Sequence, residues 1–326
     1  MYRLPVLTDI QNELMYNLKI LSSGITNTST QYKQLAKKHW DAIAKPLDSL
    51  GEFERIFQKL SAIFESEIPV IDKKCITVMC SDNGVVEEGI SQSGKEVTLA
   101  VAKSMALGTS SISVLCRSCA SDLMVIDIGI DSFDSDIYSM GVINHKLMHG
   151  TNNFVKEKAM PPDISLRAIL TGIEIVENLK SKGVNIIGTG EMGIGNTTTS
   201  SALSSALLNL PVANVTGRGA GLNDIKLQRK IDIIECGINK YGFRDKSFID
   251  SINSKSIDTR VLATIDLLSS IGGLDIAALT GIFIGGAIHK IPVVIDGVIS
   301  EVAALLSYFL NPLCKEYMIA SHLSRE

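Results

Sequence analysis

Short apolar runs alternate with longer amphipathic or apolar segments over most of the chain. The runs that are rich in β-branched residues and have the length of strands are 75–80, 123–128, 184–187, 293–295 and 317–320. The segments with a helical pattern that lie between them are 95–106, 163–181, 197–208, 224–240, 259–270, 276–288 and 299–310. Continuously apolar strands separated by helices are typical of a parallel sheet covered on both faces. The pattern therefore predicts an α/β fold with a doubly wound, mostly parallel sheet and helices on both faces.

The first seventy residues have a different pattern. Segments 31–44 and 50–64 are helical, and in the second of them apolar residues recur at a spacing near 3.6. We therefore expect residues 1–70 to form a smaller helical domain, completed by C-terminal residues, and residues 71–326 to form the α/β domain.

Composition excludes several classes of partner. The chain has 31 basic and 35 acidic residues and only 5% aromatic residues, so we expect no nucleic-acid partner. The longest apolar stretch, 276–288, is shorter than the roughly 20 residues that cross a bilayer, so we expect no membrane span. Six cysteines lie among apolar residues, and the first ten residues do not resemble a secretory leader; both features favour the cytoplasm.

One glycine-rich segment follows the third predicted strand. Residues 188–196 read GTGEMGIGN, and a helix is expected to start next to Asn196. Glycines allow backbone amides to approach an anion, and a helix N-terminus favours a phosphate. The segment fits neither a dinucleotide fingerprint nor a Walker A loop, since no Lys follows Gly195 and no helix follows the GxGxxG directly. It predicts a clamp for a single phosphate, with a purely structural turn as the alternative.

Other polar positions follow the predicted strands and could line the same edge of the sheet. Lys230 is either a solvated helix residue or a contact for phosphate or carboxylate, and Ser300 is either an N-cap or an anion contact. Asn83 and Ser91 are either turn formers or parts of a loop shaped for a ligand.

Several of these segments together resemble one family, the nicotinate-nucleotide–dimethylbenzimidazole phosphoribosyltransferases. The motifs that carry the resemblance are DNGVVEEGIS at 82–91, GEMGIGNTT at 190–198, GRGAGL at 217–222, GGLDIAALTG at 272–281, IPVVIDGVIS at 291–300 and SHLSRE at 321–326. They occur in the family's order over most of the chain.

The resemblance implies a large α/β domain, a small helical domain and a homodimer that uses no metal or cofactor. It implies transfer of the 5-phosphoribosyl group from nicotinate mononucleotide to 5,6-dimethylbenzimidazole in assembly of the cobalamin nucleotide loop. The products are α-ribazole 5′-phosphate and nicotinate.

The family's site residues map onto positions of this chain. The general base falls on Glu326. The resemblance implies a phosphate- and ribose-binding set of Glu191, Gly193, Ile194, Gly195, Asn196, Thr197, Lys230, Gly273 and Ser300. It implies a base-binding set of Ser81, Asn83, Ser91, Lys95 and Leu323.

Two positions depart from the family's usual residues: Lys95 stands where relatives often have Gln, and Asp275 where they usually have Glu. Two alternatives therefore stay open. The chain could be a non-catalytic nucleotide- or base-binding subunit that needs a paralogous partner. It could also transfer the same group to another benzimidazole, a purine or a phenolic base.

Overall fold

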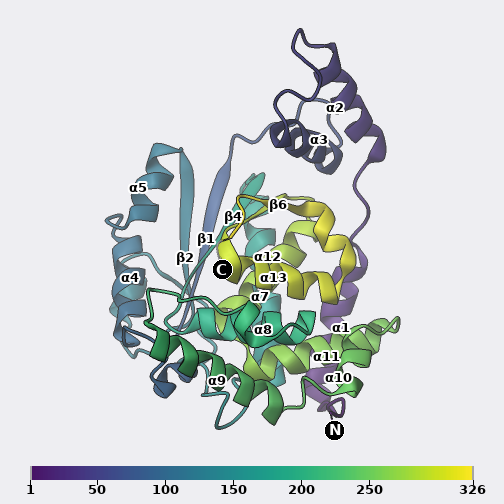
Figure 1. Cartoon of the computed structure of the whole chain (residues 1–326). Coiled ribbons are helices and arrows are strands. Elements are labelled where there is room, and N and C mark those ends of the chain that lie inside the picture. The colour runs from purple at the N-terminus through teal and green to yellow at the C-terminus, as the bar shows by residue number, and fades with distance from the viewer. Residues whose placement is uncertain (1, 325–326) are drawn as a thin grey trace.

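A computed structural model of the chain describes residues 2–324 and shows a six-stranded, all-parallel sheet (Figure 1). The strand order is β3-β2-β1-β4-β5-β6. The strands are β1 Lys74–Ser81, β2 Ser121–Gly129, β3 Ile143–Asn144, β4 Ile186–Met192, β5 Val293–Ile295 and β6 Met318–Ala320. All five predicted strands are present, and the two-residue edge strand β3 is additional.

Helices connect the strands and cover the sheet. The α-helices are α1 Asp9–Ser23, α2 Thr30–Ala42, α3 Glu52–Phe64, α4 Glu96–Ala106, α5 Ser111–Ser118, α6 Asp136–Ser139, α7 Pro162–Ser181, α8 Asn196–Leu208, α9 Asp224–Lys240, α10 Lys246–Ile252, α11 Ile257–Ile271, α12 Leu274–Ile288 and α13 Gly297–Leu310. Short 3₁₀ helices are η1 Gly84–Glu88, η2 Val212–Asn214 and η3 Pro312–Tyr317. Each predicted helix is present within a few residues.

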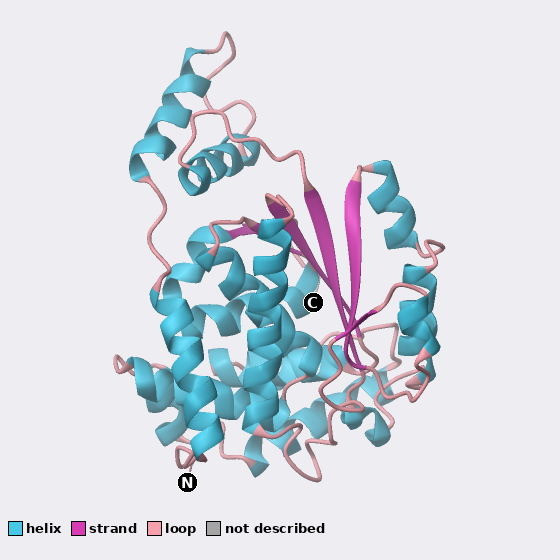
Figure 2. Cartoon of the chain, turned by 180° about the vertical axis from the view of Figure 1, so that it is seen from behind, coloured by secondary structure: helices cyan, strands magenta, loops and turns pink. Residues whose placement is uncertain are grey.

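The two faces of the sheet pack against different helices (Figure 2). Cys75 and Met79 of β1 lie in the main core with α7 and α12, whereas Val78 and Cys80 face α4 on the other side. Each strand is apolar at successive positions because both of its faces are buried. The prediction of a doubly wound α/β sheet is therefore confirmed.

Helix α12 is the buried centre of the larger layer. It packs along α7 so closely that a Cβ at Gly172 would lie 2.1 Å from the carbonyl oxygen of Ala278, and a Cβ at Gly281 would lie 2.0 Å from that of Ile169. The apolar stretch at 276–288 is therefore a core helix. Residues 96–118 also have the length and composition of a membrane-spanning segment, but they form two helices, α4 and α5, joined by a turn.

The three N-terminal helices do not pack as one unit. Helix α1 packs on α7, and its residues Met15 and Leu18 are buried in the main core. Helices α2 and α3 pair with each other and stand away from the body (Figures 1 and 2). Trp40 of α2 contacts the rings of Phe53 and Phe57 edge-on, with centroids 6.0 and 5.2 Å apart.

The turn in the glycine-rich segment is shorter than the sequence predicts. The predicted strand ended at residue 187, but β4 continues to Met192, so the residues up to 192 are extended backbone paired with β1. A Cβ at Gly188 would lie 2.4 Å from Cδ1 of Ile76, so a larger residue there would have to displace the Ile76 side chain. Only residues 193–195 form the turn that leads into α8.

Candidate active site

The carboxyl ends of β1, β2 and β4 place polar segments side by side at one edge of the sheet. Parallel strands bring their following loops to the same edge, and ligands of open α/β sheets bind there. The segments are residues 82–83 after β1, 130–131 after β2 and 193–196 after β4. The start of α12 joins them, because Asp275 contacts Asn196 of the last segment.

The turn after β4 has a conformation and a packing that require glycine. Gly195 has φ +95°, and a Cβ there would lie 2.7 Å from Cγ2 of Val86. A Cβ at Gly193 would lie 2.3 Å from the carbonyl oxygen of Ser81. The turn is therefore pressed against the segment after β1, and α8 starts directly from it at Asn196.

A small cavity of about 100 Å³ lies against this turn. Its lining includes six of the predicted site residues together with part of the loop that precedes α9: Ser91, Gly193, Ile194, Gly195, Asn196, Thr197, Arg218, Gly219 and Ala220. The cavity therefore lies at the N-terminus of α8, where backbone amides and the helix dipole favour an anion.

Lys230 of α9 is buried beside this cavity. Only 1% of the residue is exposed, and its Nζ donates to Oγ1 of Thr197 (2.9 Å) and to the carbonyl oxygen of Gly217 (3.2 Å). Because Thr197 itself lines the cavity, the ammonium group is one hydroxyl away from it. A buried cation held next to a helix N-terminus is well placed to attract a phosphate.

Two acidic side chains share one amide at the same edge. Nδ2 of Asn196 donates to Oε2 of Glu191 and to Oδ2 of Asp275, the latter at 3.2 Å. Burial, and secondarily the charge of Asp275, raises the pKa of Glu191 to about 7. Burial also raises the pKa of Asp275 to about 6. Burial thus raises the pKa of both carboxyls toward neutral pH.

Asn83 and Gly273 complete this side of the site. Nδ2 of Asn83 donates to the carbonyl oxygen of Ile194 at 3.5 Å, and a Cβ at Gly273 would lie 2.7 Å from Oδ1 of Asn83. Within the described part of the chain, Oδ1 of Asn83 and Oγ of the buried Ser300 have no hydrogen-bond partner. An unpaired buried acceptor and an unpaired hydroxyl are costly unless a ligand or water satisfies them.

The remaining predicted residues do not line this cavity, although Ser81 and Lys95 adjoin the same edge of the sheet. The hydroxyl of Ser81 is buried and donates to the carbonyl oxygen of Gly129 (3.3 Å), while Lys95 pairs with Asp131 at 3.1 Å. Leu323 is 93% exposed and lines a separate groove of about 960 Å³ between α3 and β6, so the structure does not bring it to the cavity at Gly193. Glu326 lies outside the described residues.

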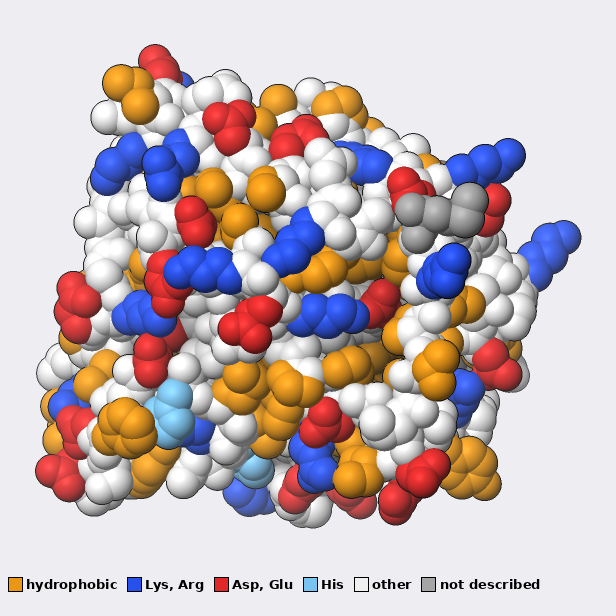
Figure 3. All heavy atoms as spheres, turned by 90° about the horizontal axis from the view of Figure 1, so that it is seen from below, with side chains coloured by type: hydrophobic (Ala, Val, Ile, Leu, Met, Phe, Trp, Pro, Cys, Tyr) orange, Lys and Arg blue, Asp and Glu red, His pale blue; other side chains and the backbone are white. Residues whose placement is uncertain are grey.

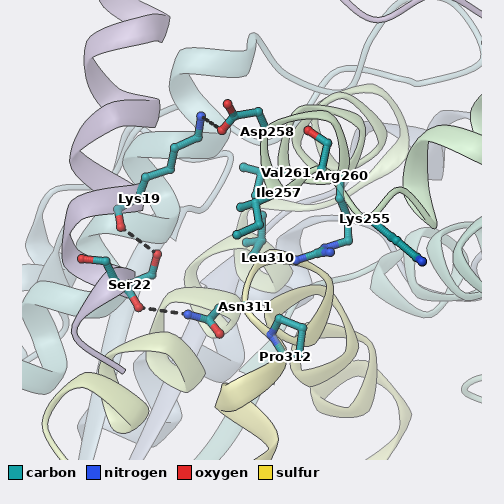
Figure 4. A pocket seen from close by; sticks show the side chains of 12 residues that line it. Lys19, Ser22, Lys255, Ile257, Asp258, Arg260, Val261, Leu310, Asn311 and Pro312 are labelled. Carbon is teal, nitrogen blue, oxygen red and sulfur yellow. Dashed lines mark hydrogen bonds and ion pairs between the residues drawn. The ribbon is translucent and has the colours of Figure 1, made fainter. Parts of the chain in front are cut away.

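A third cavity, of about 550 Å³, lies between the end of α1 and the start of α11 (Figure 4). Its polar groups bond to one another: Lys19 pairs with Asp258 at 2.6 Å, and Asn311 donates to the carbonyl oxygen of Ser22 at 2.9 Å. Of the described residues, none predicted for the site lines this cavity.

Sequence reasoning assigned no site role to Asp82, Thr98 or Asp275, although it noted Asp275 as a departure from the family's usual Glu. Asp82 and Asp275 are fully buried. The available signal was an acidic residue two positions from a glycine at the end of an apolar run, in SDNG and GGLD. Thr98 carried no such signal, because it lies within an ordinary helical pattern.

The fold and site together define the class: an α/β enzyme with a cavity at the carboxyl edge of its sheet that suits a phosphate group. The sequence profile of a family described as phosphoribosyltransferase matches residues 25–326. The chain is 43% identical over 304 residues to a nicotinate-nucleotide–dimethylbenzimidazole phosphoribosyltransferase from Ruminiclostridium cellulolyticum, covering 93% of this chain and 81% of that protein. It is 44% identical over 303 residues to the protein of the same name from Clostridium perfringens, covering 93% and 79%.

A solved structure of similar fold carries the same description. The crystal structure of the nicotinate-nucleotide–dimethylbenzimidazole phosphoribosyltransferase from Thermus thermophilus superposes with a TM-score of 0.79 at 28% identity, covering 91% of this chain and 83% of that one. The chain belongs to this phosphoribosyltransferase family, and the resemblance inferred from its motifs is confirmed.

Replacing Glu191 with Gln should change how stability depends on pH. The folded protein raises the pKa of this carboxyl from its usual value near 4.5 to about 7, so its burial lowers the free energy of unfolding as pH rises between these values. Gln has no such pKa, so the free energy of unfolding of Glu191→Gln should not fall in this way. We expect it to rise by about 1–2 kcal/mol, relative to that of the unmodified protein, when the pH is raised from about 5 to about 8. Urea unfolding at both pH values measures this difference, with Glu67→Gln, at an exposed position, as the control. If the difference in free energy of unfolding between Glu191→Gln and the unmodified protein were the same at both pH values, the pKa of Glu191 would not be raised in the folded protein.

Proposed function

We infer that this protein transfers the 5-phosphoribosyl group of nicotinate mononucleotide to 5,6-dimethylbenzimidazole, giving α-ribazole 5′-phosphate and nicotinate, in synthesis of the lower ligand of cobalamin. The observation that carries this conclusion is the match, over more than nine tenths of the chain, to relatives that bear the name of this enzyme. The cavity at the N-terminus of α8 gives the nucleotide phosphate a place to bind.

The proposed binding mode follows from charge and position. The phosphate lies in the cavity at Thr197, where the N-terminus of α8 and the ammonium of Lys230 offset its charge. The ribose hydroxyls reach the carboxyl pair, where Glu191 accepts hydrogen bonds from them. Holding both reactants in one place supplies much of the rate enhancement of such a displacement.

The chemistry needs one proton acceptor. The bond from the anomeric carbon to the pyridinium nitrogen breaks, and nicotinate leaves with a neutral ring nitrogen, so no acid is required. The bond to one benzimidazole nitrogen forms on the opposite face, which inverts the anomeric carbon. The proton on the other nitrogen passes to a carboxylate, and we assign this role to Glu326 from its place in the SHLSRE motif.

We also propose that the protein acts in the cytoplasm as a homodimer. The tip of the α2–α3 hairpin exposes a cluster of apolar side chains, Ile43, Leu47, Leu50 and Phe53, which a second copy could cover. All six cysteines are free thiols, which supports a reducing compartment. On the face at the bottom of Figure 1, basic and acidic side chains are interspersed (Figure 3), which is unlike a nucleic-acid-binding surface.

The activity is tested by incubating the purified protein with nicotinate mononucleotide and dimethylbenzimidazole and following both products by chromatography. We expect nicotinate and α-ribazole 5′-phosphate in equal amounts. Glu326→Gln should lose at least about 100-fold in kcat while nucleotide binding, measured by calorimetry, is retained. If the unmodified protein binds the nucleotide but forms no product, the non-catalytic subunit is favoured instead. If the reaction is faster with a purine or a phenol than with dimethylbenzimidazole, the acceptor is that base.

Lys230→Met should weaken nucleotide binding, because it removes the buried cation beside Thr197 while keeping a side chain of similar length. We expect KM for nicotinate mononucleotide to rise about 10- to 100-fold, since a hydrogen bond to a charged group contributes about 1.5–3 kcal/mol. The control is Lys226→Met, one turn earlier on α9. Equal KM values for the two variants would remove Lys230 from the phosphate site.

Phe53→Ser should shift the protein from dimer to monomer, because Phe53 is 59% exposed at the hairpin tip. Light scattering coupled to size-exclusion chromatography measures the mass. Val6→Ser, at a position that is 97% exposed outside the hairpin, is the control and should remain dimeric. A monomeric unmodified protein would contradict the homodimer, and a dimeric Phe53→Ser would place its interface elsewhere.

A further inference from the structure

Thr98 of α4 occupies a buried position between two loops of the site. Its hydroxyl donates to Oδ1 of Asp82 at 2.6 Å and accepts the backbone N–H of Ile194 at 3.2 Å. Thr98 and Asp82 are both fully buried. A hydroxyl has one hydrogen, and an ionised carboxylate can only accept. The Asp82 carboxylate therefore takes the hydroxyl hydrogen and leaves an oxygen lone pair for the Ile194 amide.

Asp82 is itself held from two further directions. Its Oδ2 accepts the backbone N–H of Asp131 at 2.8 Å, and its carbonyl oxygen accepts the N–H of Thr151 at 3.0 Å. The side chain thus ties the segment after β1 to the segment after β2 and, through Thr98, to the turn after β4. One buried carboxylate orients the ends of three strands.

The Ile194 amide lies at the middle of the turn that lines the cavity. Its neighbours are Gly193 and Gly195, and glycine has more backbone freedom than any other residue. The hydrogen bond to the Ile194 amide therefore restricts the backbone of a residue that lies between two glycines, and it adds to the bond that Asn83 makes to the Ile194 carbonyl. The same bond commits the Ile194 N–H to Thr98, so the contribution of Ile194 to the cavity comes from its other atoms.

We propose that Thr98, oriented by Asp82, is a positioning residue for the phosphoribosyl transfer: it fixes the 193–195 turn in the conformation that binds the nucleotide phosphate. This proposal rests on the function proposed above and deepens it. Thr98 itself touches no reacting atom, because its hydroxyl is taken up by Asp82 and Ile194. Its effect passes through the turn, so it should act on nucleotide affinity more than on the chemical step.

The test compares two substitutions that separate the hydroxyl from packing. Thr98→Val keeps the shape and removes the hydroxyl, whereas Thr98→Ser keeps the hydroxyl and removes a methyl group. We expect Thr98→Val to raise KM for nicotinate mononucleotide about 10-fold, with a smaller change in kcat and in KM for dimethylbenzimidazole. Thr98→Ser should keep the KM of the unmodified protein even where its thermal stability falls. The control for a buried Thr→Val change is Thr264→Val, in α11, whose hydroxyl donates to the carbonyl oxygen of Arg260 in the preceding turn of the same helix.

Amide hydrogen exchange of residues 193–197 gives a readout that needs no activity. In Thr98→Val, the Ile194 amide hydrogen should exchange at least about 10-fold faster than in the unmodified protein. In Thr98→Ser, its exchange rate should be unchanged. Unchanged exchange and unchanged KM in Thr98→Val would overturn the proposal, as would equal KM increases in the Ser and Val variants. If the unmodified protein has no transferase activity, the proposed function fails, and the exchange rates still decide whether Thr98 holds the turn.

Discussion

Acidic side chains at the carboxyl edge of an apolar sheet are the constraint around which this site is built. Asp82 and Asp275 are fully buried, and Glu191, near the end of β4, is half-buried. A buried carboxyl needs hydrogen-bond donors or a proton, and both solutions occur here. Asp82 receives donors from helix α4 and from the loop after β2, whereas Glu191 and Asp275 share one amide. Burial raises the pKa of all three carboxyls. The geometry of the loops follows from how these groups are satisfied.

The core fixes where those acids lie. Helix α12 starts immediately after Gly273, and its close packing on α7 through Gly172 and Gly281 allows little sliding. Asp275, in the first turn of α12, is therefore held at a set distance from β1 and β4. The polar site is thus positioned by apolar packing that lies one to two helical turns away from it.

Much of this arrangement could be predicted from the sequence. The strands and most helices followed from apolar periodicity, and the glycine-rich segment identified the turn and the start of α8. The predicted length of β4 was wrong because Gly188 and Gly190 suggest a turn locally, whereas in the structure both pair with β1 and pack closely on the side chains of Ile76 and Val78. The edge strand β3 was missed because two residues carry no periodic pattern.

The contacts within the site could be predicted less well, because they join distant parts of the chain. Asn196 was expected to contact the nucleotide, but its amide is occupied by Glu191 and Asp275, which come from a strand and from a helix 79 residues further on. Thr98 lies within a regular helix, and only the folded structure brings it to Ile194. Leu323 lines the groove with α3, away from the cavity at Gly193, and its contact with the base stays a prediction. Local pattern identifies elements, whereas long-range pairing decides which polar groups remain for a ligand.

The location of the nucleotide phosphate tests the account most directly. A crystal structure of the protein soaked with nicotinate mononucleotide should show the phosphate at the N-terminus of α8, within hydrogen-bond distance of Oγ1 of Thr197 and close to Nζ of Lys230. Phosphate density in the groove beside α3, or in the cavity between α1 and α11, would contradict it.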